Sequence, residues 1–161
     1  MPSEYHNNVE IGIKEFGKLY KRFKKICGGN IPIPINHPTQ RMRPILYHPD
    51  VYFVTKFGGL FIFEILDSEL NDENLVIADI LLACLSPNAK KVFFIVPKEE
   101  VQEKINDLAV TIIDNLVSKG ISNKELPNVV ATIYILENEA LTSENVKKVL
   151  INSAVDRGVT I

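Results

Sequence analysis

The fold of this chain follows from the segment DVYFVTKFGGLFIFEILD, residues 50–67. Residues 51–55 are β-branched or aromatic, Gly58-Gly59 supplies a tight turn, and residues 60–66 form a second, largely apolar run. This pattern predicts a β-hairpin with arms over 50–56 and 60–67. The second arm is apolar on both alternating faces, so we expect a central strand that is covered on both sides.

The segments after the hairpin alternate between helix and strand patterns. We expect a helix over 72–85 with Asp72 as its N-cap, a strand over 91–96, a helix over 98–119, a strand over 128–136 and a helix over 141–155. Alternation of this kind implies right-handed crossovers. The sequence therefore predicts an α/β fold, with a mixed sheet flanked by helices on both faces.

Two segments precede the hairpin. Apolar residues recur at spacings of three and four from Ile13 to Ile26, which predicts a helix over 8–26 that ends at Gly28-Gly29. Residues 30–49 hold five prolines, which remove backbone donors. We expect an extended connector there, with at most short edge strands, one of them over 41–47.

Composition indicates the class of protein. The 161 residues are 46% hydrophobic and 24% charged, values typical of one globular domain, residues 1–161, that folds without a disulfide. The polar residues 1–8 predict no secretory signal, and no apolar run reaches the roughly 20 residues of a membrane helix. Cys27 and Cys84 lack a metal-binding spacing and are expected to be buried thiols in a reducing, cytoplasmic setting.

Positive charge is concentrated in the first third of the chain. The net charge of −2 does not indicate a nucleic-acid-binding protein, yet residues 1–50 hold eight basic against four acidic residues. Four lysines would share one face of the first helix, either as a solvated surface or as a stripe that follows phosphates. They are Lys14, Lys18, Lys21 and Lys25.

Two carboxylates stand out around the hairpin. Glu64 lies inside a strand expected to be buried, where a charge must be ion-paired, protonated or bound to a cation. Asp50 opens the first arm, as part of a metal site or of a plain Pro-Asp turn. The turn at Gly58-Gly59 would bring both carboxylates toward the same end of the hairpin, where Mg²⁺ or Mn²⁺ would suit their oxygen ligands.

Pro49-Asp50, the glycine hairpin and Glu64-Ile65-Leu66 together resemble the PD-(D/E)xK motif of the restriction-endonuclease-like nuclease superfamily. The family core runs helix, three-stranded meander, helix, strand, and would correspond to residues 8–96. Residues 97–161 would then be an added strand and helices. The motif is short, so it indicates the family only together with the matching order of helices and strands.

The resemblance implies a set of site residues. Asp50, Glu64 and the carbonyl of Ile65 would bind the metal ion, and Glu10 or Glu15 on the first helix would complete the site, with Glu10 favoured. The four lysines, with Arg41 and Arg43, would hold the nucleic-acid backbone.

The sequence departs from the family at one essential position. The family's lysine, two residues after the glutamate, is Leu66 here, and leucine cannot orient a water molecule. Lys98 follows a strand expected to run parallel to the Glu64 strand, so it could replace that lysine. It could equally be an ordinary surface lysine in the first turn of a helix.

These features leave three functions open. The first is a metal-dependent deoxyribonuclease, an endonuclease that hydrolyses DNA phosphodiester bonds with Mg²⁺ or Mn²⁺, with a homodimer as a further expectation. The second is a catalytically inactive nuclease-fold protein that binds nucleic acid or another protein. The third is an unrelated interaction domain in which Glu64 is ion-paired. Tyr47, Tyr52 and Phe57 could stack on bases, although aromatic strand residues more often belong to the core.

Overall fold

A five-stranded mixed sheet forms the centre of the molecule. The computed structural model describes residues 3–35, 43–67, 72–138 and 140–153. The sheet has the order β1-β4-β5-β6-β7, with bounds β1 Phe23–Gly28, β4 Val51–Thr55, β5 Leu60–Ile65, β6 Ala89–Val96 and β7 Val129–Tyr134. Strands β1, β4 and β5 are antiparallel neighbours, whereas β5, β6 and β7 run parallel. The expected α/β class, mixed sheet and hairpin are confirmed.

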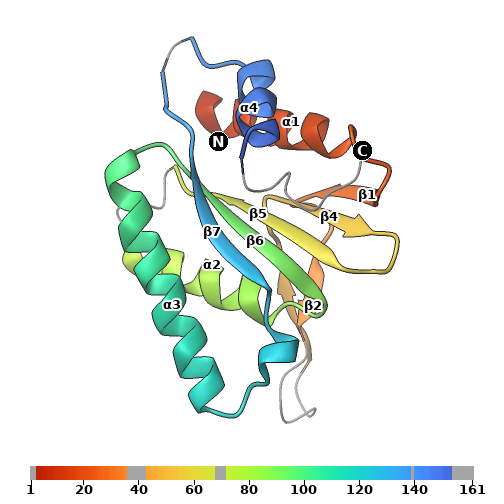
Figure 1. The fold of residues 1–161 in the computed structure, drawn as a ribbon, viewed down its shortest axis with the longest axis vertical. Coiled ribbons are helices and arrows are strands. Elements are labelled where there is room, and N and C mark those ends of the chain that lie inside the picture. The colour runs from red at the N-terminus through yellow and green to blue at the C-terminus, as the bar shows by residue number, and fades with distance from the viewer. Residues whose placement is uncertain (1–2, 36–42, 68–71, 139, 154–161) are drawn as a thin grey trace.

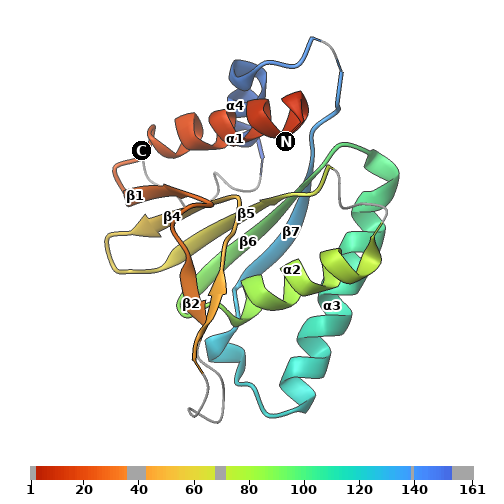
Figure 2. The ribbon, with the colours of Figure 1, turned by 180° about the vertical axis from the view of Figure 1, so that it is seen from behind.

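Four helices cover the two faces of this sheet. They are α1 Glu4–Gly17, α2 Glu73–Leu85, α3 Gln102–Ser118 and α4 Ser143–Ile151. Figure 1 shows α1 and α4 on one face and α2 and α3 on the other, and Figure 2 shows the same layers from behind. Asp72, the predicted N-cap of α2, and Thr142, the N-cap of α4, both accept hydrogen bonds from amides of the first turn. Two single-turn 3-10 helices, η1 Glu99–Val101 and η2 Asn123–Glu125, lie at the two ends of α3.

Alternate side chains of the central strands pack into two separate hydrophobic cores, one on each face of the sheet. Phe61, Phe63 and Ile65 of β5 pack under α1 and α4, while Ile62 and Leu66 pack under α2 and α3. All six residues of β5 are buried, as expected for a strand covered on both sides. Any charged group on β5 is therefore enclosed by protein.

The predicted helix over 8–26 is wrong in its second half. Helix α1 ends at Gly17, and Phe23–Gly28 forms edge strand β1, paired with β4. An irregularity in the ladder between Phe23 and Lys25 spaces the buried residues three and four apart, as a helix would. Pairing with β4 satisfies the backbone of this segment and overrides the apparent helical period. Gly28-Gly29 therefore ends a strand, not a helix.

The proline-rich connector contains a small second sheet. Strands β2 Ile33–Ile35 and β3 Ile45–Tyr47 pair antiparallel, and Tyr47 is buried against the core under α2. The strand expected over 41–47 thus covers only its last three residues among those described. Among the described residues, no helix has the length and apolar character needed to cross a membrane.

Gly12 sets the distance between α1 and α4. A Cβ atom at Gly12 would lie 2.5 Å from Cβ of Val146 and 2.8 Å from the carbonyl oxygen of Ser143. Both groups belong to a helix that cannot move without losing its own packing on the sheet. The two helices can therefore pack this closely only with glycine at position 12.

We predict that Gly12→Ala destabilises the protein by about 1–3 kcal/mol, because overpacking outweighs the roughly 1 kcal/mol gain in helix propensity. Urea unfolding followed by circular dichroism measures the change. Gly28→Ala is the matched control, since the nearest atom there is the mobile Lys14 Nζ at 3.2 Å. Equal stability of Gly12→Ala and wild type would contradict the close packing of α1 on α4.

Candidate functional site

The register of the hairpin places Asp50 and Glu64 at one edge of the sheet. Val51 pairs with Phe63, so one further step along the ladder would set Asp50 opposite Glu64. Ile65 pairs in parallel with Ile95, which brings the segment after β6, including Lys98, to this same edge. Lys98 is exposed there and precedes η1. Segments far apart in the sequence, before β4, at the end of β5 and after β6, thus lie at this edge.

Asp50 is fixed by two contacts. Its Oδ2 accepts a hydrogen bond of 2.7 Å from the backbone amide of Ile65, and its Oδ1 lies 3.0 Å from Nε2 of His6. His6 lies in the first turns of α1, whose N-cap Ser3 accepts a hydrogen bond from the His6 amide. The carboxylate therefore joins α1 to the end of β5.

The environment of His6 is anionic. Its pKa is raised from 6.5, chiefly by the hydrogen bond to Asp50 against the opposing effect of burial, with further contributions from the charges of Asp50, Asp67 and Glu10. Nδ1 of His6 is buried and has no hydrogen-bond partner among the described residues. A protonated His6 would place a positive charge among these three carboxylates.

Glu64 is buried and hydrogen-bonded. Only 4% of its surface is exposed, and Oε1 accepts a hydrogen bond of 2.7 Å from the hydroxyl of Tyr47. The pKa of Tyr47 is raised well above 10, first by burial and then by the negative charges of Glu64, Asp79 and Asp50. Three carboxylates therefore contribute to the raised pKa of one phenol, which lies in the core under α2.

The two candidate glutamates of the first helix have different neighbours. Glu10 lies one turn after His6 and forms an ion pair of 3.2 Å with Lys14. The pKa of Lys147 on α4 is raised chiefly by its hydrogen bond to Glu144, with a smaller contribution from the charge of Glu15, so Glu15 lies within electrostatic reach of α4. Glu10 is thus the glutamate of α1 that reaches the electrostatic surroundings of His6.

Leu66 occupies the position of the family's lysine and is fully buried. Its amide donates to the carbonyl of Ile95, and its side chain packs in the core under α2 and α3. No cationic side chain can take that place without rebuilding the core. If a lysine acts at this edge, it must therefore come from another position. Lys98 is the candidate from the sequence analysis.

The lysine stripe predicted for the first helix does not exist as one helix face. Lys14 lies on α1, Lys18 is its C-cap, Lys21 lies in a turn and Lys25 lies on strand β1. The prediction failed because the helix ends earlier than the apolar period indicated. Arg43 is exposed just before β3, and Arg41 lies outside the described residues.

Sequence reasoning missed His6 and Tyr47 as partners of the two carboxylates. The three histidines have no metal-binding spacing, so sequence does not single out His6, and the sequence pattern indicates only a core or stacking role for Tyr47. Among the described residues, no group of three or more His, Cys, Asp or Glu side chains is arranged to hold a metal ion. The roles of Asp50, Glu64, Ile65, Glu10 and Lys98 stay predictions.

Comparison with known proteins adds no relative to these observations. No protein-family model, no curated protein and no solved structure matches the chain. A function for this chain must therefore be inferred from the geometry of the site itself.

We predict that the pKa of His6, followed by NMR titration of its ring protons, lies above 6.5 and falls in Asp50→Asn. Asp67→Asn should lower it less, because Asp67 acts only through its charge. A raised pKa stabilises the folded state below about pH 6.5, and this contribution is lost as pH rises through the folded-state value. An unchanged titration in Asp50→Asn would contradict the pairing.

We also predict that Tyr47→Phe lowers the free energy of unfolding by about 1–3 kcal/mol, since it removes a hydrogen bond to a buried carboxylate. Chemical denaturation measures this loss. Tyr134→Phe on β7 is the control. A Tyr47→Phe protein as stable as wild type would show that the bond to Glu64 contributes little.

Proposed function

We propose that the edge of the sheet formed by Asp50, Glu64 and Lys98 is the site of a divalent-cation-dependent nuclease that hydrolyses DNA phosphodiester bonds. The observation that carries this proposal is the β4–β5 register, in which the pair Val51–Phe63 stands directly beside Asp50 and Glu64. Mg²⁺ and Mn²⁺ prefer oxygen ligands such as carboxylates, and this hairpin supplies two.

The charges around the site support a cation there. Asp67, Glu10 and Asp50 all raise the pKa of His6, and Asp50, Glu64 and Asp79 all act on Tyr47. Several negative groups in one region repel one another unless a positive charge lies among them. Protonated His6 provides one such charge, and Mg²⁺ or Mn²⁺ would provide a stronger one.

The donor atoms of the site suit a hard cation in part. Asp50 and Glu64 offer carboxylate oxygens, and the carbonyl of Ile65 would be the third ligand by resemblance to the family. His6 competes for Oδ1 of Asp50, so metal binding would require this hydrogen bond to open. A bound ion would polarise the phosphate and lower the pKa of a water molecule.

The chain's own residues would perform the remaining tasks. The Ile65 amide fixes the orientation of the Asp50 carboxylate, which keeps the first ligand in place. The amine of Lys98, exposed at the same edge, would stabilise negative charge on the phosphate. His6, once released from Asp50, could accept or donate a proton near neutral pH.

A second function is favoured by the burial of Leu66 and by the two contacts of Asp50. In a binding protein without catalysis, the His6–Asp50 pair would be structural and would join α1 to the sheet. The chain would then keep the nuclease-like order of elements as a module that binds nucleic acid or another protein.

The deciding experiment is cleavage of supercoiled plasmid and of a four-way DNA junction in Mg²⁺, Mn²⁺ or EDTA. We expect metal-dependent cutting by the wild type and a loss of at least about 100-fold in the Asp50→Ala, Glu64→Ala double variant. If cutting occurs, Lys98→Ala tests the proposed replacement lysine and should slow the reaction.

The matched control removes two exposed carboxylates of α3, in Asp107→Ala, Asp114→Ala. It should cut like the wild type. Absence of cutting by folded wild-type protein, or equal cutting by the Asp50 and Glu64 double variant, would reject the catalytic proposal and favour the binding module.

A further inference from the structure

The turn between β4 and β5 presents an aromatic ring to solvent. Phe57 is 101% exposed, more than any other large apolar residue among those described. The backbone around it is firmly held: the Thr55 amide donates to the Gly59 carbonyl at 2.8 Å, and the Gly59 amide donates to Thr55 Oγ at 3.0 Å. Gly58 adopts a φ of +84°, which glycine permits without strain. A rigid turn therefore carries the exposed ring.

Two lysines lie near this turn, one within it and one on β6. Lys56 is exposed beside Phe57, and its amide donates to the carbonyl of Arg22, where β1 begins. Lys90 at the start of β6 lies across the turn, since a Cβ atom on Gly59 would be 2.9 Å from Lys90 Cγ. Lys56 and Lys90 thus lie on either side of the turn that carries Phe57.

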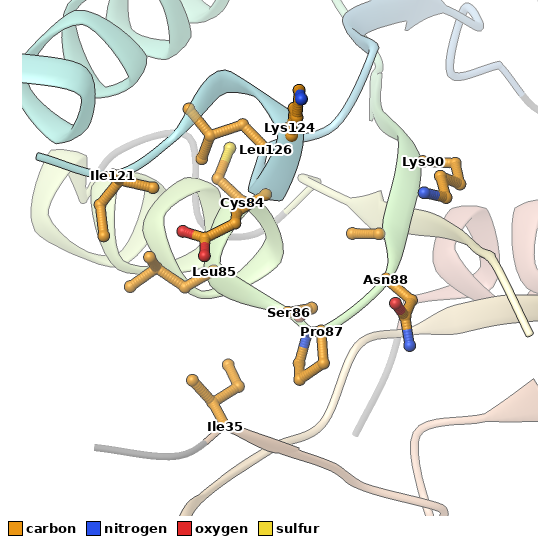
Figure 3. Close-up of a pocket in the computed structure, with 12 residues that line it drawn as sticks. Ile35, Cys84, Leu85, Ser86, Pro87, Asn88, Lys90, Ile121, Lys124 and Leu126 are labelled. Atoms are coloured by element: carbon orange, nitrogen blue, oxygen red, sulfur yellow. The ribbon is translucent and has the colours of Figure 1, made fainter. Parts of the chain in front are cut away.

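A hollow of about 430 Å³ opens beside Lys90. It lies between the end of α2, the start of β6 and the η2 segment, and Figure 3 shows apolar side chains from Ile35, Leu85 and Ile121 around it. Lys90 and Lys124 also line it, with Glu125 as the acidic member of the lining. Its volume lies within the range of roughly 300–1,000 Å³ that is usual for small-ligand sites.

We propose that this end of the sheet binds single-stranded nucleic acid. One base stacks on Phe57, the phosphates pass Lys56 and Lys90, and a neighbouring base enters the hollow near Lys124. An exposed aromatic ring offers a flat apolar surface that suits any unpaired base, and adjacent lysines neutralise the phosphates. Base pairs of a duplex keep their faces stacked on one another, so the unpaired strand is the favoured form.

The chemistry of the turn favours nucleic acid over a lipid surface. A loop that enters a membrane interface usually presents several apolar side chains, whereas Phe57 is followed here by Gly58 and Gly59. The hollow adds a second apolar site, and Lys90 lines it as well. An anionic membrane shares the phosphate chemistry and is therefore included as an outcome of the test.

This binding surface is separate from the site of the proposed nuclease. Phe57 and Lys90 lie at the Leu60 end of β5, whereas Glu64 lies near the other end, on the order of 13 Å away along the strand. Binding should therefore occur in EDTA and should not require Asp50 or Glu64. Loss of cleavage and loss of binding can be observed independently.

The experiment measures fluorescence anisotropy of a labelled 20-nucleotide thymidine strand with full-length protein in EDTA. We expect Phe57→Ala to weaken binding about tenfold, in line with loss of one stacked base. Lys90→Gln should weaken binding and reduce the dependence of log Kd on log salt by about 0.7. The Asp107→Ala, Asp114→Ala variant should bind like the wild type.

Matched controls separate a specific site from general surface effects. Leu46→Ala removes another exposed apolar side chain, and Lys104→Gln removes another exposed lysine; neither should change Kd. No binding by the wild type, or equal weakening by Phe57→Ala and Leu46→Ala, would overturn the proposal. A third outcome would also overturn it: wild type sediments with phosphatidylserine vesicles, Phe57→Ala does not, and both bind the thymidine strand equally.

Discussion

The burial of β5 on both faces is the constraint that organises this molecule. A strand enclosed by two helical layers must be almost wholly apolar, and five of its six residues are. The exception, Glu64, must be compensated where it lies, which Tyr47 does from the separate β2–β3 sheet. The small second sheet thus has a structural role: it supplies a hydrogen-bond donor to Glu64, the one charged residue of the central strand.

The same strand explains how the edge of the sheet is assembled. Asp50 precedes β4 and accepts a hydrogen bond from the amide of Ile65 at the end of β5, beyond the last β4–β5 pair, Val51–Phe63. The carboxylate takes the place of a backbone acceptor there and also engages His6 of α1. One side chain therefore connects the sheet to the helical layer above it.

Much of the fold was predictable because local pattern and tertiary structure agree. The glycine turn, the two apolar arms and the caps Asp72 and Thr142 have causes that lie within a few residues of sequence. The helix prediction for residues 18–28 was wrong because an edge strand with an irregular ladder can mimic a helical period. The partners His6 and Tyr47 were missed for a different reason: their contacts depend on packing across 44 and 17 residues, which no local pattern encodes. The edge of the sheet could be located from sequence, but the state of its carboxylates could not.

The close seat of α1 on α4 at Gly12 has a consequence for synthesis of the protein. These helices come from opposite ends of the described sequence, so α1 leaves the ribosome long before the surface on which it rests exists. The hairpin and the β5–β6 pair can form earlier, from contacts closer in sequence. Until α4 emerges, the face of the sheet with Phe61 and Phe63 lacks part of its cover. The nascent chain would therefore expose an aromatic surface to chaperones during this interval.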